Sequence, residues 1–183
     1  MKKTGFFYNS AICIACGACQ VACQNEKGLQ PGEFFRRVVL RPGRDGRTVP
    51  FSGGCNHCMR PACAAACPTG AMRRDETLGV VLHDSGLCIG CASCVWSCPY
   101  GAVSLSASAG TAQKCDSCLD RRMQGRQPAC TAACPVGALR WSGPPADEPG
   151  WRQLRAPFLP DPARTDPTTM TRFPVEEGGA DCG

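Results

Sequence analysis

The sequence contains no long apolar run. Its longest apolar stretches, such as residues 62–66 and 79–82, fall far short of the roughly 18 residues that would suggest a bilayer span. Residues 1–10 also lack the apolar segment and the small-residue cleavage site of an export signal. We therefore expect no signal peptide and no transmembrane helix in this chain, which would be soluble or held at a membrane by a partner.

Aromatic residues and histidines are scarce. The aromatic residues make up 7% of the chain, and there are only two histidines. The apolar side chains are too few and too scattered for a large core, and two histidines argue against an acid–base site within the chain. The sequence also has no phosphate-binding loop, GxGxxG turn or zinc-hydrolase helix. An autonomous nucleotide-dependent or hydrolytic enzyme is therefore unsupported.

Cysteine is abundant, with 17 in 183 residues. Sixteen of them fall into four groups of four: Cys13, Cys16, Cys19 and Cys23; Cys55, Cys58, Cys63 and Cys67; Cys88, Cys91, Cys94 and Cys98; Cys115, Cys118, Cys130 and Cys134. The seventeenth, Cys182, lies outside the groups, and we interpret it as an incidental free thiol.

The spacing within the groups indicates iron–sulfur clusters. The first and third groups have the spacing C-x2-C-x2-C-x3-C, which lets one loop hold three corners of a cubane. In two-cluster ferredoxins with this run, the fourth cysteine ligates the other cluster. The groups should therefore work in pairs, and four groups predict two two-cluster modules. The second and fourth groups only enlarge one loop of the same pattern.

Two other uses of cysteine remain as alternatives. Sixteen cysteines could make four zinc sites, but zinc needs neither this run nor the proline that follows the last cysteine of three groups. A disulfide scaffold is disfavoured because cysteines two residues apart pair poorly and no secretion signal is present.

The same motif, Cys-Pro-x-Gly, begins at the last cysteine of three groups: Cys67-Pro68-Thr69-Gly70, Cys98-Pro99-Tyr100-Gly101 and Cys134-Pro135-Val136-Gly137. Proline stops the short helix that carries the last cysteine, and glycine permits a tight turn before a strand. We expect strands over 5–8, 37–40, 80–83, 103–105 and 139–141, and helices over 18–24, 62–67, 92–98 and 128–134. The predicted fold class is α+β with much loop.

The formal net charge of +5 counts the cysteines as neutral thiols. Four cubanes, each about −2 when oxidised, would bring the total to about −3. The basic excess then compensates cluster charge, and among Lys114, Asp116, Arg121 and Arg122 we expect some side chains to do so or to face a partner. No basic stripe with interleaved aromatics is present, so we expect no nucleic-acid binding.

Three further features have less specific interpretations. His57 lies inside the second cysteine group, and we predict that it is a neighbour of a cluster. Trp96 is expected to pack in the core around a cluster. The proline-rich tail from residue 142 is expected to be extended. A disordered end is the alternative, but its apolar residues favour an arm that contacts a partner: Trp151, Leu154, Phe158, Leu159, Met170 and Phe173.

The sequence resembles the four-cluster iron–sulfur subunits of the molybdopterin oxidoreductases, the family of the dimethyl sulfoxide, polysulfide and thiosulfate reductases. The resemblance covers about residues 5–141. It rests on these motifs: Gly5-Phe6-Phe7-Tyr8, Phe35-Arg36-Arg37-Val38, Cys55-Asn56-His57-Cys58, Cys88-Ile89-Gly90-Cys91 and Lys114-Cys115-Asp116-Ser117-Cys118. Ala15 departs from the family because glycine is common there, which concerns only the local loop.

The resemblance implies nested ligand sets for four [4Fe–4S] clusters. The sets are Cys13, Cys16 and Cys19 with Cys134; Cys115, Cys118 and Cys130 with Cys23; Cys55, Cys58 and Cys63 with Cys98; and Cys88, Cys91 and Cys94 with Cys67. Residues 1–54 and 106–141 would form an outer two-cluster ferredoxin module, residues 55–105 an inner one, and residues 142–183 the partner-contacting tail.

The resemblance also implies partners. These are a large molybdopterin-containing (Mo or W) catalytic subunit and a membrane subunit that exchanges electrons with quinone. The chain would then have no catalytic residues, would relay single electrons between these partners and would lie peripherally at the bacterial cytoplasmic membrane, on either side. The alternative function is a free-standing soluble polyferredoxin.

Overall fold

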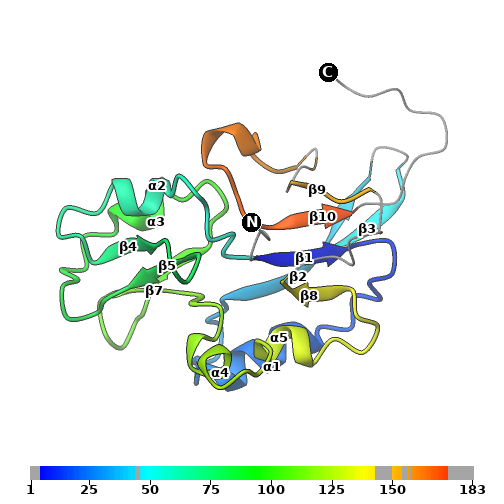
Figure 1. Ribbon diagram of the computed structural model, residues 1–183, viewed down its shortest axis with the longest axis horizontal. Coiled ribbons are helices and arrows are strands. Elements are labelled where there is room, and N and C mark those ends of the chain that lie inside the picture. Colours follow the sequence, from blue (N-terminus) through cyan, green and yellow to red (C-terminus); the bar gives the residue numbers. More distant parts are fainter. Residues whose placement is uncertain (1–4, 44–45, 143–149, 154–155, 157, 173–183) are drawn as a thin grey trace.

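The computed structural model describes residues 5–43, 46–142, 150–153, 156 and 158–172. Short helices and short strands alternate along a loop-rich chain (Figure 1), which confirms the α+β class. None of the helices in these ranges is long and apolar enough to cross a membrane.

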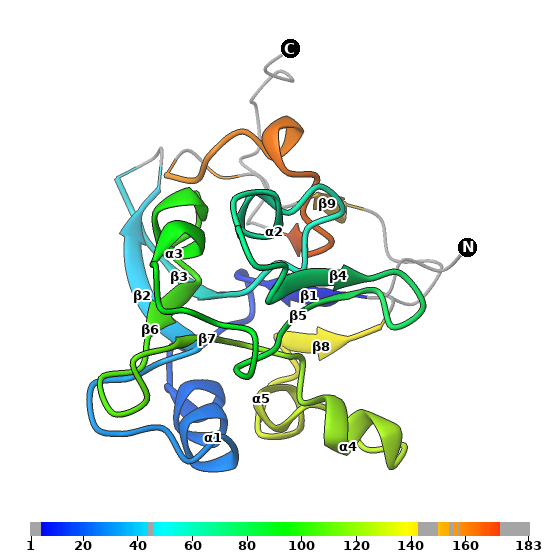
Figure 2. The same cartoon turned by 90° about the vertical axis from the view of Figure 1, so that its left-hand side faces the viewer.

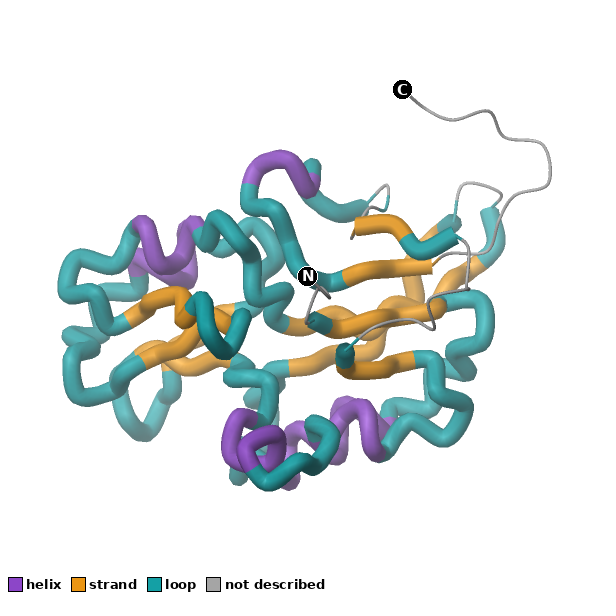
Figure 3. The backbone as a smooth tube through the Cα atoms, viewed as in Figure 1, coloured by secondary structure: helices purple, strands orange, loops and turns teal. Residues whose placement is uncertain are grey.

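A four-stranded sheet joins the two ends of the chain. Strand β1 (Phe6–Asn9) pairs antiparallel with β8 (Leu139–Trp141) and parallel with β10 (Met170–Arg172), which pairs antiparallel with β9 (Arg152–Gln153). Phe6 packs edge-on against Trp141, with ring centroids 4.8 Å apart. Burial of these two aromatic rings holds β1 in the middle of the sheet (Figure 3).

Three antiparallel hairpins make up the rest of the strands. They are β2 (Arg36–Pro42) with β3 (Thr48–Gly54), β4 (Met72–Asp75) with β5 (Val80–His83), and β6 (Val103–Leu105) with β7 (Ala112–Lys114). The last two hairpins lie together at one end of the molecule, on the left of Figure 1.

The helices form two groups. Helices α2 (Ala62–Ala65) and α3 (Ser93–Ser97) pack together beside the β4–β5 and β6–β7 hairpins. Helix α1 (Ala18–Glu26) packs against α5 (Ala129–Ala132), and α4 (Leu119–Met123) lies on the same side, as Figure 2 shows. A 3₁₀ turn, η1, spans Pro162–Arg164.

Cysteines form a large part of both cores. One core combines Phe6, Tyr8, Val80, Leu139 and Trp141 with Cys23, Cys55, Cys115 and Cys130. The other combines Met72, Val81, Val103 and Ala112 with Cys63 and Cys94. Aliphatic and aromatic side chains therefore make up only part of each core, as their scarcity in the sequence predicts.

All the predicted strands and helices are present, with small shifts of their ends. The Cys-Pro-x-Gly motif also makes the predicted tight turn, because Gly70, Gly101 and Gly137 all have positive φ, between 60° and 70°. Each glycine N–H donates to the carbonyl of the cysteine three residues earlier, at 3.2–3.4 Å. Strands β3, β4, β7, β9 and β10 and helix α4 were not predicted.

Trp96 is a correction. It was expected in the core around a cluster, but it is 86% exposed. Helix α3 is only five residues long and buries Cys94. A side chain two residues further along a helix points to the opposite face, which here is the solvent side.

The described part of the tail contacts the chain itself. Trp151 packs edge-on against Phe7 at 5.6 Å, and Phe158 against Phe51 at 5.3 Å. Met170 belongs to β10, beside β1. Leu154, Phe173 and Cys182 lie outside the described residues, and contact between the tail and a partner stays a prediction.

Candidate functional site

All sixteen grouped cysteines lie in the described part of the chain, and all are free thiols. Nearly all are buried or half-buried. The exceptions are Cys16 and Cys91, the second cysteines of the first and third groups, which are exposed. Two of the cysteine groups therefore reach the molecular surface.

The structure gathers Cys55, Cys58, Cys63 and Cys98 around one cavity. Burial, together with the neighbouring Cys55, Cys98 and Cys58, raises the pKa of Cys63 to about 12. Burial likewise raises the pKa of Cys58 to about 11. Three members of this set come from the second group and the fourth from the third group.

A second neighbourhood contains Cys23 with the fourth group. Burial raises the pKa of Cys23 to about 12, and nearby Cys130 and Cys118 contribute. Burial also raises the pKa of Cys115, whose neighbours include Cys23 and Cys130. Helices α1 and α5, which carry Cys23 and Cys130, pack directly against each other.

A third neighbourhood contains cysteines of the first group. Burial raises the pKa of Cys19, and Cys130 and Cys134 raise it further. Cys13, Cys19 and Cys134 pack against the same core. Cys16 is exposed, and no contact places it against the other three.

The fourth neighbourhood joins Cys67 to the third group. Burial raises the pKa of Cys94, and its neighbours are Cys67, Cys88 and Cys91. Cys67 and Cys88 pack against the same core. The last cysteine of the second group thus lies among the first three of the third.

The cysteines of each neighbourhood could hold a [4Fe–4S] cluster. No group of three or more His, Cys, Asp or Glu side chains in the described residues could hold a single metal ion. Zinc needs its ligands about 2.0–2.3 Å from one point, whereas a cubane places a metal–sulfur core between its four thiolates. Buried thiols with raised pKa values need such a core to stabilise their thiolate form.

Backbone N–H groups donate to several of the sulfurs. The donors are Met72 to Cys67, Ala102 to Cys98 and Ala112 to Cys88, each at 3.4 Å, and Ser117 to Cys115 at 3.3 Å. Hydroxyls of Ser52 and Ser93 lie 3.5 and 3.4 Å from the sulfurs of Cys19 and Cys91. Hydrogen bonds of this kind stabilise thiolates and tune the potentials of clusters.

Arg36 supplies a buried positive charge that sequence reasoning did not single out. It is only 4% exposed, its Nη1 donates to the Ser52 carbonyl at 3.0 Å, and its guanidinium lies 4.5 Å from the centre of the Phe6 ring. Burial lowers the pKa of Arg36, but nearby thiolates outweigh burial and raise it; they belong to Cys130, Cys115, Cys19 and Cys23. The sequence shows only an arginine beside a predicted strand, and it does not show which face of that strand is buried.

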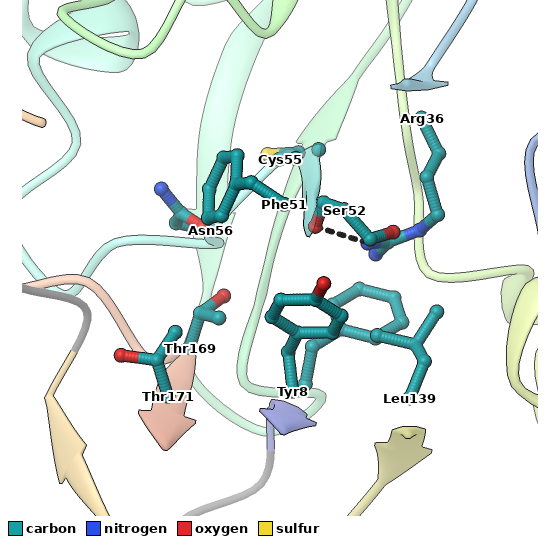
Figure 4. A pocket seen from close by; sticks show the side chains of 12 residues that line it. Tyr8, Arg36, Phe51, Ser52, Cys55, Asn56, Leu139, Thr169 and Thr171 are labelled. Carbon is teal, nitrogen blue, oxygen red and sulfur yellow. Dashed lines mark hydrogen bonds between the residues drawn. The ribbon is translucent and has the colours of Figure 1, made fainter. Parts of the chain in front are cut away.

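Arg36 also lines a pocket beside Cys55, with Tyr8, Phe51 and Ser52 around it (Figure 4). The Tyr8 hydroxyl donates to the carbonyl of Pro50 at 2.8 Å. Burial raises the pKa of Tyr8, and nearby Cys13 raises it further, so this phenol stays protonated.

Lys114 supplies a second buried positive charge. It is 6% exposed, and its Nζ donates to the carbonyls of Val81 and Cys115. It lies near enough to Cys63 to lower the pKa of that thiol. Of the charged residues expected to neutralise clusters, Lys114 has the most buried position. Asp116 instead pairs with Lys27 at 2.8 Å.

His57 is fully buried next to Cys58. Its Nδ1 accepts from the Val81 N–H at 3.1 Å, and its Nε2 has no hydrogen-bond partner among the described residues. Burial lowers the pKa of His57, and the cations around it lower it further. The ring is therefore neutral, with its proton on Nε2. Its role beside a cluster stays a prediction.

The chain matches two family models for iron–sulfur proteins. Residues 47–143 match a 4Fe–4S dicluster domain, and residues 10–26 match a 4Fe–4S binding domain. The class is therefore that of ferredoxin-type proteins that bind [4Fe–4S] clusters.

Curated relatives identify the family more narrowly. The chain is 39% identical over 155 residues to the B chain of the anaerobic dimethyl sulfoxide reductase of Escherichia coli (strain K12), which covers 79% of this chain and 74% of that protein. It is 37% identical over 162 residues to the B subunit of the sulfite dehydrogenase of Allochromatium vinosum, covering 75% and 68%. It is 36% identical over 143 residues to protein NrfC of Escherichia coli (strain K12), covering 75% and 64%.

This protein therefore belongs to the family of iron–sulfur electron-transfer subunits that includes the B chain of anaerobic dimethyl sulfoxide reductase. The resemblance stated from the sequence is confirmed. Members of this family relay electrons and are not the catalytic subunit of their oxidoreductase.

Proposed function

We propose that this chain relays single electrons through four [4Fe–4S] clusters within a molybdopterin oxidoreductase complex. The observation that carries the proposal is the grouping of the cysteines. In each neighbourhood, cysteines of one group lie beside the last cysteine of another, as nested pairing requires. Each cluster, when bound, accepts and releases one electron.

The residues of the chain have two tasks in this proposal. The sixteen cysteines hold the clusters at fixed positions, and backbone N–H groups, Arg36 and Lys114 offset the negative charge that clusters gain on reduction. No proton transfer or substrate binding is needed in this chain.

The four proposed clusters divide into two modules. Residues 55–105 would hold the inner pair of clusters, and residues 1–54 with 106–141 the outer pair. The inner pair is supported by the α2–α3 packing and by the separate core that contains Cys63 and Cys94. The outer pair is supported by the α1–α5 packing.

The positions of the two exposed cysteines, Cys16 and Cys91, support a relay whose two ends reach the molecular surface. Exposed apolar side chains flank each of them: Ile12, Ile14 and Val21 around Cys16, and Leu87, Ile89 and Trp96 around Cys91. Exposed apolar side chains are typical of surfaces that bind another protein. We assign one end to a catalytic subunit that holds Mo or W between pterins, and the other to a membrane subunit that exchanges electrons with quinone, so that the chain would lie peripherally at the membrane.

Anaerobic purification of the chain expressed from its native promoter tests the proposal. About sixteen irons per chain, together with a large molybdenum- or tungsten-containing subunit, is the expected result. The same iron content in a chain that purifies alone as a monomer would favour the free polyferredoxin. Zinc in place of iron would contradict both.

A further inference from the structure

A segment near the C-terminus crosses the loop that carries the second cysteine group. We name residues 162–171 the C-terminal strap. The N–H groups of Met59 and Arg60 donate to the carbonyls of Asp166 and Thr165 in the strap, at 2.8 and 3.0 Å. In return, the Thr168 N–H and hydroxyl both donate to the Asn56 carbonyl, at 3.0 and 2.8 Å. With a fifth hydrogen bond, from Arg60 Nη2 to the Ala163 carbonyl, these contacts fix the strap to residues 56–60.

Thr165 is the strap residue that enters the candidate cluster cavity. It is 3% exposed and lines the cavity together with Cys55, Cys58, Cys63 and Cys98. Its Oγ1 lies 3.0 Å from the hydroxyl of Tyr100, which also lines the cavity. Thr165 and Cys58 line the same cavity, and the nearby Thr165 hydroxyl lowers the pKa of the Cys58 thiol against the effect of burial.

The direction of these hydrogen bonds follows from the chemistry of the groups. A cysteine that ligates iron is a thiolate and has no proton to donate. A threonine hydroxyl has only one hydrogen but can also accept. A hydrogen bond between Thr165 and a Cys58 thiolate would therefore run from the hydroxyl to the sulfur, and Tyr100 would then donate to Thr165. Such a chain of two hydroxyls would end on the sulfur.

From this geometry we propose that the strap seals the cluster held by Cys55, Cys58, Cys63 and Cys98, and that Thr165 raises its reduction potential by donating to Cys58. The inference rests on the proposed cluster ligands. Reduction adds negative charge to the cluster, and a hydrogen bond to a ligand sulfur stabilises that charge. The strap also excludes water from one side of the cavity, and solvent exposure is another determinant of potential.

Gly5 allows the strap backbone to pack closely against the start of the chain. A Cβ at this position would come within 2.6 Å of the Thr168 carbonyl oxygen. That is closer than backbone atoms can be without a shift of the strap. Glycine is thus needed at residue 5 because the strap backbone passes directly over it.

The first test is Thr165→Val in the full chain, produced anaerobically and loaded with clusters. Valine keeps the shape of threonine and removes the hydroxyl. We expect full iron content, a lower midpoint potential for one cluster and unchanged potentials for the others in an EPR-monitored redox titration. A tenfold fall in the reduced-to-oxidised ratio at a fixed potential corresponds to about 59 mV. Thr165→Ser should restore the potential.

Thr168→Val is the matched control. Thr168 belongs to the same strap and is also buried, but its hydroxyl donates to the Asn56 carbonyl rather than toward a sulfur, and its N–H still donates to that carbonyl in the variant. We expect no comparable shift in potential. Tyr100→Phe is a second test, since it removes the donor to Thr165 and leaves the strap intact. It should lower the same potential by less than Thr165→Val does.

Gly5→Ala tests the seal by displacing the strap instead of removing a hydroxyl group. We expect severalfold faster loss of iron from one cluster in air, whereas Gly86→Ala should leave the rate unchanged. A Cβ at the exposed Gly86 would meet only the Asp84 carboxylate, at 3.3 Å.

Unchanged potentials in both Thr165→Val and Tyr100→Phe would overturn the tuning role of Thr165. An unchanged rate of iron loss in Gly5→Ala would overturn the seal. Failure of the unaltered protein to bind iron would contradict the proposed function instead, so the two failures are distinguishable.

Discussion

At the scale of single residues, Ala15 shows how a loop that wraps a cluster restricts the backbone. Ala15 and Gly90 hold the same place in their cysteine runs, and both have positive φ, 55° and 69°. Gly90 cannot be replaced without cost, because a Cβ there would lie 2.5 Å from the Gly110 carbonyl oxygen. At Ala15 the Cβ fits, but the left-handed conformation still costs roughly 1–2 kcal/mol.

Ala15→Gly should therefore stabilise the chain. The relief of backbone strain exceeds the entropy that glycine adds to the unfolded state, which leaves a net gain of about 0.5–1 kcal/mol. The melting temperature of the cluster-loaded chain under argon should rise by roughly 1–4 °C. Ala11→Gly is the control, since Ala11 has no positive φ and should only lose stability. A fall in melting temperature for Ala15→Gly would contradict this account of the loop.

Arg36 is the second residue whose role can be measured. Arg36→Met removes a buried positive charge near cysteines of two proposed clusters, so reduction of both becomes less favourable. We expect both midpoint potentials to fall by about 50–100 mV, which corresponds to about 1–2 kcal/mol for one electron. Redox titration followed by EPR measures this shift.

Arg37→Met is the matched control for Arg36→Met, because Arg37 is the next residue of β2 and its side chain is exposed. Equal shifts in the two variants would show that Arg36 acts only through the net charge of the protein.

At the scale of elements, the packing of α1 against α5 decides which cysteines meet. Helix α1 contains Cys19 and Cys23, α5 contains Cys130, and Cys134 follows two residues after α5 ends. Helix α1 therefore contributes cysteines to two neighbourhoods, and α5 together with the turn after it does the same. This arrangement favours nested ligand sets over sets made of one group each.

Nested pairing predicts which variants share a defect. Cys16→Ser and Cys134→Ser should abolish the same EPR signal, although 118 positions separate the two residues in the chain. Cys118→Ser should abolish a different signal. Loss of the same signal in Cys134→Ser and Cys118→Ser would mean that each group holds its own cluster.

Much of the element content could be predicted from the sequence because the cysteine runs and the cysteine–proline turns are local signals. Helices α2, α3 and α5 and strands β6 and β8 all lie beside such signals. Strands β3, β9 and β10 have none, since β10 exists only because β1 offers it an edge 163 residues earlier. The cysteines proposed as ligands follow from the same local signals and stay a prediction, whereas Arg36 and Thr165 lie near cysteines through tertiary packing that no local pattern encodes.

At the scale of the whole molecule, the ligand cysteines take the place that aliphatic side chains have in other domains. Both cores contain cysteines of the four groups, and burial raises the pKa of Cys23, Cys63 and Cys115. The clusters therefore contribute to the stability of the fold as well as to electron transfer.

Removal of the clusters should consequently unfold the chain. Anaerobic treatment with a chelator and ferricyanide is expected to abolish the regular far-UV circular dichroism signal and to make residues 5–142 sensitive to protease. Retention of the native spectrum and of protease resistance without iron would mean that the apolar residues alone suffice.

The most direct test of the central claim, a relay of four one-electron clusters, is a reductive titration of the purified chain with iron determined on the same sample. The account predicts about sixteen irons and uptake of about four electrons per chain, with four separate midpoint potentials. About eight irons and two electrons in a fully loaded, folded chain would contradict it.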